Sequence, residues 1–200
     1  MAWYNEPVRQ LPGIVPAHAR MVHYSKGRTV PFGAHRLPNV GVCDHTYLFH
    51  IVRNYHSLAP VTVFLPGSWY QGWKRVLTWY VLCLVGLRGT TCLPAGPVLQ
   101  TMDFSVDNWQ PTHPDNRGPS HELSPAWPRP FGRWFRANFP GETLKSVVYK
   151  GIFAASASDI RRRPREFYAS LLHQVSCHPR HEAAHYIERS WHCILTKSLT

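Results

Sequence analysis

The C-terminal part of the sequence contains its clearest catalytic pattern, His181-Glu-Ala-Ala-His185. This spacing matches H-E-x-x-H, in which two histidines one helical turn apart bind zinc and the glutamate activates water. The extended form of such proteases has glycine seven and histidine ten residues after the first histidine, where this chain has Glu188 and Trp191. Because a chain with thirteen histidines matches the pattern easily by chance, we interpret it as coincidental and predict no metal ligands.

A second glutamate, Glu188, lies among histidines in the same segment. His181, His185, Glu188 and His192 recur at i, i+4, i+7 and i+11, so they share one face of a helix. A glutamate flanked by histidines can act as a general base or as a metal ligand. It can equally belong to a polar network or to a solvated face. Both alternatives stay open for Glu188, whereas we expect structural roles for His181 and His192.

Other chemical patterns are weak or missing. Asp103 and Asp107 are spaced to hold a divalent cation with the help of a diphosphate, but we expect an ordinary acidic loop there. The sequence lacks the G-x-x-x-x-G-K-[ST], G-x-G-x-x-G and G-x-S-x-G motifs. ATPase, dinucleotide-binding and nucleophile-elbow hydrolase functions therefore have no support.

The composition favours anionic partners. The formal net charge is +11, with eleven carboxylate side chains. Phosphorylated small molecules, nucleic acids and acidic membrane surfaces all attract such a protein. The basic residues form one short run, Arg161–Arg163 followed by Arg165. This scattered distribution favours a phosphate pocket, and we predict no nucleic-acid partner.

Residues 73–88 are the segment most suited to a membrane surface. Their apolar run, Val76–Leu87, has twelve residues, against the ~20 that a spanning helix needs. Basic and tryptophan residues flank this run, so peripheral membrane contact is an alternative to burial. The first seven residues are too polar for a signal peptide, and the five cysteines contain no C-x-x-C pair. These features predict a cytoplasmic protein.

The segment 37–68 is expected to organise the fold as one helix followed by one strand. Its apolar residues at helical period are Tyr47, Leu48, Ile51, Val52 and Tyr55. Asp44 stands where an N-cap residue would, and Val61–Leu65 has the β-branched and aromatic composition of a core strand. Ligands of open α/β sheets bind beyond the carboxyl ends of strands. The loop 66–73 is therefore the first place to look for function.

The whole chain, residues 1–200, is expected to be one α/β domain with a mixed or mostly parallel sheet flanked by helices. Further strands are expected at 20–24 and 147–154, and further helices at 71–87, 164–175 and 179–195. Residues 93–140 are rich in proline and tryptophan. We predict that they form a long, ordered but irregular insertion.

Several blocks of residues resemble those of one family. The blocks span nearly the whole chain and are Tyr4-Asn5-Glu6, Tyr24-x-Lys26-Gly27, Leu37-Pro-Asn-Val-Gly41, His45-Thr-Tyr-Leu48, Ile51-x-x-Asn54-Tyr55-x-x-Leu58, Val63-Phe64-Leu65, Phe153-Ala154, Ile160-Arg161-x-Arg163-Pro164-x-x-Phe167-Tyr168 and His185-Tyr186-x-Glu188-Arg189-x-Trp191. Together they are similar to an uncharacterised domain family of fungi, bacteria and large DNA viruses that is regarded as glycosyltransferase-like. The resemblance implies an A-type glycosyltransferase fold, a nucleotide-sugar donor and a glycan acceptor.

The resemblance also implies roles for individual blocks. The block at Tyr4, Asn5 and Glu6 would lie at the end of the first strand, near the nucleotide. The loop after Leu65 would lie where such folds hold the sugar diphosphate and often a metal. Because Pro66-Gly67-Ser68 offers no carboxylate, the resemblance supplies no ligand for a divalent cation.

Basic side chains are predicted to neutralise the leaving diphosphate instead, and the candidates are Lys74, Arg161 and Arg163. Glu188 is the predicted general base and Glu6 the alternative, with His185 in the same block as Glu188. The leading hypothesis is therefore a glycosyltransferase-like protein. A non-catalytic nucleotide- or carbohydrate-binding module is the second hypothesis, and a zinc protease is the third.

Overall fold

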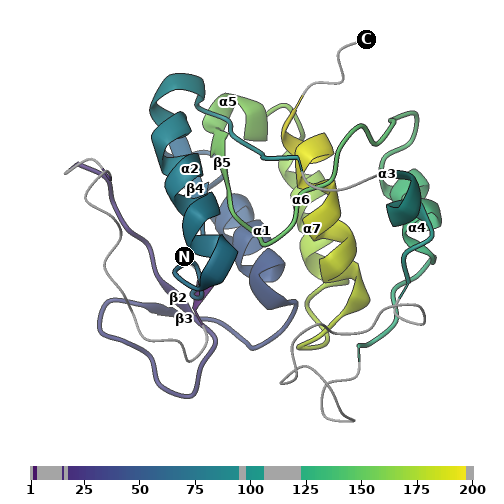
Figure 1. Cartoon of the computed structure of the whole chain (residues 1–200). Helices are drawn as coiled ribbons and strands as arrows, with labels where there is room; N and C mark the ends of the chain where they lie inside the picture. Colours follow the sequence, from purple (N-terminus) through teal and green to yellow (C-terminus); the bar gives the residue numbers. More distant parts are fainter. Residues whose placement is uncertain (1, 4–14, 16–17, 95–97, 106–122, 197–200) are drawn as a thin grey trace.

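Two helices, α1 (Val42–Asn54) and α7 (Glu182–Leu195), pack against each other at the centre of the fold, and α6 (Arg165–Gln174) packs beside α1 (Figure 1). The apolar stripe expected in α1 faces this centre, because Tyr47, Leu48 and Ile51 are buried. On α7 every residue is buried except His185, Glu188 and His192. The two helices therefore form the scaffold on which the other elements lie.

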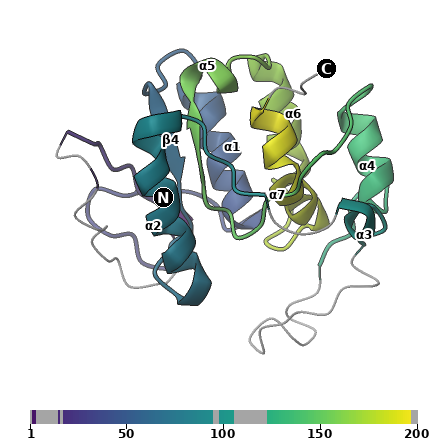
Figure 2. The same cartoon turned by 45° about the horizontal axis from the view of Figure 1, so that its top comes forward.

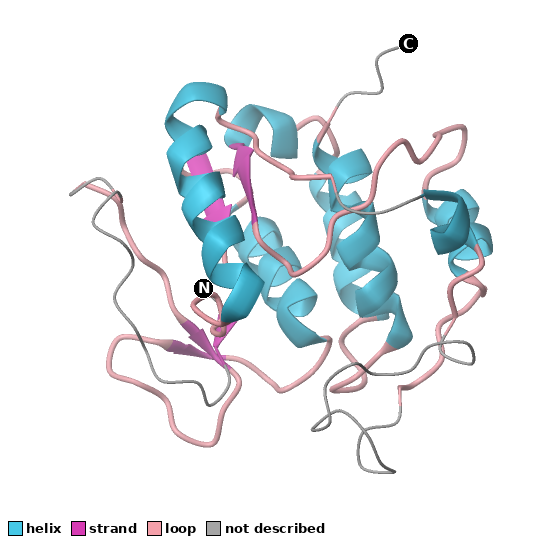
Figure 3. Cartoon of the chain, in the orientation of Figure 1, coloured by secondary structure: helices cyan, strands magenta, loops and turns pink. Residues whose placement is uncertain are grey.

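The computed structural model describes residues 2–3, 15, 18–94, 98–105 and 123–196, and these form one mixed α/β domain. Figure 3 shows that the helices dominate and that the strands are few and short. The remaining helices are α2 (Gly72–Arg88), α3 (Val98–Met102), α4 (Phe131–Asn138) and α5 (Ala157–Ile160). The helices predicted over 71–87, 164–175 and 179–195 are confirmed, with ends displaced by at most a few residues.

Within the described residues the strands form two small sheets. Strands β1 (Ala2–Trp3), β2 (Tyr24–Ser25) and β3 (His35–Arg36) are parallel, and β4 (Val61–Phe64) pairs antiparallel with β5 (Phe153–Ser156). In this part of the chain the mixed or mostly parallel sheet that the sequence predicts is present as these two small sheets. The A-type glycosyltransferase fold stays a prediction. The strand expected at 147–154 begins only at Phe153, because Lys150 and Gly151 turn the backbone with φ angles of 74° and 63°.

The β4–β5 ribbon lies between two apolar layers. Side chains alternate across a strand, so Phe64 and Phe153 join the main core while Ile152 and Ala154 face the other side. There they pack with Val81 of α2. Figures 1 and 2 show α2 on one side of the ribbon and α1 on the other. This arrangement places the N-terminal end of α2 close to the central helices.

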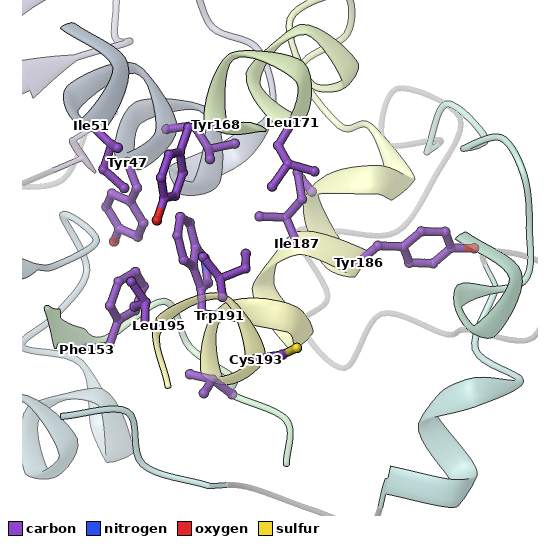
Figure 4. Close-up of a cluster of buried hydrophobic side chains, with 14 of the residues drawn as sticks. Tyr47, Ile51, Phe153, Tyr168, Leu171, Tyr186, Ile187, Trp191, Cys193 and Leu195 are labelled. Carbon is purple, nitrogen blue, oxygen red and sulfur yellow. The ribbon is translucent and has the colours of Figure 1, made fainter. Parts of the chain in front are cut away.

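The main core is rich in aromatic side chains. Figure 4 shows Tyr47, Phe153 and Trp191 converging from three elements, with ring centroids of Phe153 and Trp191 4.8 Å apart. Tyr186 extends away from this group toward α4, where its ring centroid lies 5.5 Å from that of Trp134. Residues 93–140 were expected to be irregular, yet they contain α3 and α4, and α4 buries its aromatic face in this core.

Candidate functional site

A pair of carboxyl groups, Asp44 on α1 and Glu188 on α7, is the main polar feature inside the fold. Asp44 is buried, and its Oδ1 accepts a hydrogen bond of 2.7 Å from Nε1 of Trp191. Burial, and then the neighbouring charge of Glu188, raise the pKa of Asp44 to about 7. Burial also raises the pKa of Glu188, whose carboxylate accepts a hydrogen bond from the backbone N–H of Lys150.

The raised pKa values mean that the two carboxyl groups resist carrying two negative charges at once. Desolvation and a like charge both disfavour the ionised form of a carboxyl group. Such a pair loses its two protons in separate steps that belong to the pair rather than to one residue. Near neutral pH the Asp44–Glu188 pair can therefore take up or release a proton, which is what a general base must do.

Three lysines, Lys26, Lys74 and Lys150, stand close enough to affect this pair. Lys26 is buried, and its Nζ donates to the backbone oxygens of Val40 and Val42. Desolvation lowers the pKa of Lys26 to about 8, although the nearby Cys43 and Asp44 act in the opposite direction. The charges of Arg189, Lys150 and Lys74 act against burial and lower the pKa of Glu188. The pair thus lies in a positively charged surrounding.

Lys74 connects this group to the loop that follows β4. Its Nζ donates a hydrogen bond of 2.6 Å to Oγ of Ser68. Ser68 follows Pro66-Gly67 in the loop that the sequence marked as the first place to look for function. The structure therefore brings the loop after β4 and the glutamate of α7 into one neighbourhood.

The backbone around the pair is strained at two residues other than glycine. Val42 and Lys150 have φ angles of 49° and 74°, a conformation that is costly for side chains with a Cβ and above all for a β-branched residue. Both residues serve the site through their backbone, because Val42 accepts from Lys26 and Lys150 donates to Glu188. Strain of this kind concentrates at functional sites, where the surrounding structure holds it in place.

Gly151 packs closely against Cys43, the residue next to Asp44. A Cβ at this position would lie 2.9 Å from Sγ of Cys43, closer than real contacts allow. The backbone oxygen of Gly151 accepts a hydrogen bond of 2.8 Å from the hydroxyl of Tyr47. Burial raises the pKa of the Cys43 thiol well above its usual value. Cys43 is therefore a neutral thiol beside Asp44 and not a nucleophile.

The site has a buried side and a side that meets solvent. Asp44 and Lys26 are buried, Glu188 and Lys74 are partly exposed, and Lys150 is exposed. Glu188 is thus the more exposed member of the pair. Asp44 is the buried member, and the hydrogen bond from Trp191 holds its carboxyl group in place.

Of the site residues predicted from the sequence, the structure brings Glu188 and Lys74 together. Tyr4, Asn5 and Glu6 lie outside the described residues, and so does Asp107 of the acidic pair. The roles predicted for these four residues therefore stay predictions.

Arg161 and Arg163 make contacts that hold the fold together. Arg161 donates to the backbone oxygens of Tyr55 and His56 at the end of α1. Arg163 forms a two-pronged ion pair with Glu142, with N···O distances of 2.8 and 2.7 Å, and donates to backbone oxygens near the end of α7. These contacts favour structural roles, so we do not retain the two arginines in the site.

The H-E-x-x-H pattern serves the start of α7. Nδ1 of His181 accepts a hydrogen bond of 3.1 Å from the backbone N–H of Ala183 and so caps the helix. Glu182 is fully buried and accepts a hydrogen bond of 2.8 Å from the N–H of Ala126. Burial lowers the pKa of His185 to about 4. Among the described residues, no group of three or more His, Cys, Asp or Glu side chains is arranged to hold a metal ion.

Sequence reasoning missed Asp44, Lys26 and Lys150 as site residues. Asp44 was expected to cap α1, but the cap position is Gly41 and Asp44 lies inside the first turn. Lys26 belongs to one of the family-like blocks, Tyr24-x-Lys26-Gly27, which is a signal that could have been used. Lys150 has no comparable signal, because only the folded backbone brings it to Glu188.

Comparison with known proteins identifies a family but no activity. A family model described as "Protein of unknown function (DUF3431)" matches residues 20–200. No curated protein and no solved structure matches the chain. The site must therefore be interpreted from its own chemistry.

Proposed function

We propose that this chain, which belongs to the DUF3431 family of unknown function, is a glycosyltransferase-like enzyme. It would use the Asp44–Glu188 pair as its base. In this proposal a nucleotide sugar donates its glycosyl group to an acceptor hydroxyl. The observation that carries the proposal is the carboxyl pair, with a pKa of about 7 at Asp44, beside lysines whose charges act on Glu188.

The reaction needs a base at the acceptor. A new bond forms between the acceptor oxygen and the anomeric carbon, while the bond from that carbon to the diphosphate breaks. The acceptor hydroxyl loses its proton, and Glu188 takes it up because Glu188 is the partly exposed member of the pair. A base works best when its pKa lies near the working pH. The pair meets this condition because burial and the charge of Glu188 raise the pKa of Asp44 to about 7, and burial raises the pKa of Glu188.

The reaction also needs positive charge at the leaving group. The nucleoside diphosphate departs with additional negative charge, which preorganised cations stabilise in the transition state. Lys74 and Lys150 carry positive charges that act on Glu188, and both are at least partly accessible to solvent. Lys26 is buried, and its Nζ donates hydrogen bonds to two backbone oxygens. We therefore assign it a structural role at the start of α1.

The decisive experiment combines donor binding with donor turnover. A panel of nucleotide sugars is tested for thermal stabilisation of the protein, with and without manganese. Release of nucleoside diphosphate is then followed with water and with simple sugars as acceptors. The variants are Glu188→Gln and, as a matched control, Glu166→Gln, which changes an exposed glutamate on α6.

We expect a donor that stabilises the protein and is turned over. Glu188→Gln should reduce turnover by roughly 100-fold or more while donor stabilisation persists, and Glu166→Gln should behave as wild type. Donor stabilisation of the wild type without any turnover would favour the second hypothesis, a non-catalytic binding module. No stabilisation by any donor would contradict both.

A further inference from the structure

The outward face of α2 is apolar along its whole length. Its exposed residues on this face are Trp73, Val76, Trp79, Tyr80, Cys83 and Leu87. With 3.6 residues per turn they lie within an arc of about 120° and extend over about 20 Å of helix. We call this set the α2 stripe.

The exposure of the α2 stripe is large. Trp73 is 77% exposed, Tyr80 54% and Leu87 83%. The opposite side of α2 already has its partners, because Leu77, Val81 and Val85 pack against the β4–β5 ribbon. The stripe is therefore additional to the apolar surface that holds α2 on the domain.

A surface helix normally turns charged and polar residues outward. Here the sequence of α2 contains no aspartate or glutamate, and its charged residues are Lys74, Arg75 and Arg88. Lys74 belongs to the candidate site, whereas Arg75 and Arg88 are exposed near the two ends of the stripe. A contiguous apolar face with this rim is typical of an interaction surface.

The charges indicate which partner covers the stripe. In a pair of identical α2 helices the rim of each copy would present arginines and no carboxylate, so like charges would meet. The chain as a whole carries a net charge of +11, which also opposes self-association. An anionic surface complements both features.

The aromatic residues indicate the same partner. Tryptophan and tyrosine favour the boundary between the hydrocarbon and the headgroups of a bilayer, and the stripe contains Trp73, Trp79 and Tyr80. No helix of the described residues is long and apolar enough to cross a membrane. A helix with an apolar face and a basic rim instead lies in the plane of the membrane surface.

We propose that the α2 stripe docks the protein on the surface of a bilayer that contains anionic lipids, with Trp73, Tyr80 and Leu87 inserted among the headgroups. Arg75 and Arg88 then contact lipid phosphates or carboxylates at the two ends of the helix. This inference goes beyond the sugar-transfer proposal and does not depend on it, because none of the stripe residues belongs to the candidate site.

The test is co-sedimentation of the protein with large vesicles. One preparation is pure phosphatidylcholine and the other contains about one third phosphatidylserine, a strongly anionic composition. The variant is Leu87→Glu, and the matched control is Leu99→Glu in α3. These two leucines have nearly equal exposure, 83% and 85%, and the two variants add the same charge. Thermal unfolding verifies that both variants fold, and sedimentation equilibrium reports the oligomeric state of each.

We expect binding to the anionic vesicles that weakens as salt is added. Leu87→Glu should lower the vesicle affinity roughly tenfold or more, because it removes the burial of one large apolar side chain. Leu99→Glu should bind as wild type does. A second stripe variant, Trp73→Ala, should weaken binding as well.

Three results would overturn the proposal. The first is wild-type protein that does not bind anionic vesicles. The second is equal binding of the Leu87→Glu and Leu99→Glu variants. The third is a wild-type dimer that Leu87→Glu dissociates, since a second copy of the chain would then cover the stripe.

Discussion

Replacing Asp44 by asparagine should stabilise the protein at neutral pH. The amide has the shape of the carboxyl group and keeps an oxygen that can accept the hydrogen bond from Trp191. It cannot ionise, so it removes the cost of holding a negative charge in a buried position beside Glu188. Most substitutions of buried polar residues destabilise a protein. A stabilising effect would therefore indicate that ionised Asp44 is costly in its buried position beside Glu188.

The magnitude follows from the pKa of Asp44. Its value rises from 3.8 to about 7 on folding. The folded state therefore binds more protons than the unfolded state between these values, and the free energy of unfolding falls as pH rises through this window. A shift of about three units corresponds to at most about 4 kcal/mol. We expect Asp44→Asn to recover on the order of 2–4 kcal/mol at pH 7.5 and little or none at pH 4.

The assay is urea denaturation of wild type and Asp44→Asn between pH 4 and pH 7.5. The quantity of interest is the difference in the free energy of unfolding between the two proteins. Buried histidines change this free energy with pH in the direction opposite to Asp44. Burial lowers the pKa of both His45 and His50 to about 4. These groups contribute stability that is present above pH 6.5 and is lost as pH falls toward 4. Subtraction removes their contribution.

A difference that does not change with pH would refute the reasoning. So would an Asp44→Asn variant that is less stable than wild type by the same amount at pH 5 and pH 7.5. Either result would mean that Asp44 is an ordinary ionised carboxylate in the folded protein. At the upper limit of pH 7.5 most of Lys26 is still protonated, because its pKa is about 8.

Three further predictions concern stability and titration. Gly151→Ala should lower the free energy of unfolding by roughly 2–4 kcal/mol in urea denaturation, because its Cβ would overlap a neighbour at a positive φ. In the control Gly141→Ala the new Cβ meets no neighbour, so the free energy of unfolding should fall by only about 1 kcal/mol. Equal losses of stability in the two variants would contradict the packing argument. Arg163→Lys should cost about 2 kcal/mol, because lysine cannot form the paired contact with a carboxylate, while Arg136→Lys on the surface should cost almost nothing. The ring of His45 should titrate near pH 4 by NMR, and a value near its ordinary pKa would contradict its burial.

The helices around the site could be predicted because their signals are local. Tyr47, Leu48 and Ile51 repeat at helical spacing, and these residues are the buried face of α1. The same kind of signal exists in α4, where Phe131, Trp134 and Phe135 lie three and four residues apart. It was overlooked because the surrounding prolines favoured an irregular segment. Helix α4 could therefore also have been predicted from the sequence.

The sheets and the site depend on contacts that no local pattern encodes. The strand expected at 147–154 forms only from Phe153, after a turn at Lys150 whose positive φ is unusual for a lysine. The pairing of Asp44 with Glu188 joins residues on two helices far apart in the sequence. An aspartate near a helix start is normally a cap, so nothing in the sequence distinguishes this buried one. Glu188 and Lys74 were chosen individually, and only the structure shows that they are neighbours.

The central claim is that the Asp44–Glu188 pair is the base of a sugar-transfer reaction, and the pH dependence of donor turnover tests it most directly. If the claim holds, the turnover number of the wild type rises with pH through a value near 7, as the pair loses its shared proton. In Asp44→Asn the rise moves to lower pH, because Glu188 no longer has a charged neighbour. A turnover number that is constant between pH 5 and pH 8, or a profile that Asp44→Asn leaves unchanged, would contradict the claim.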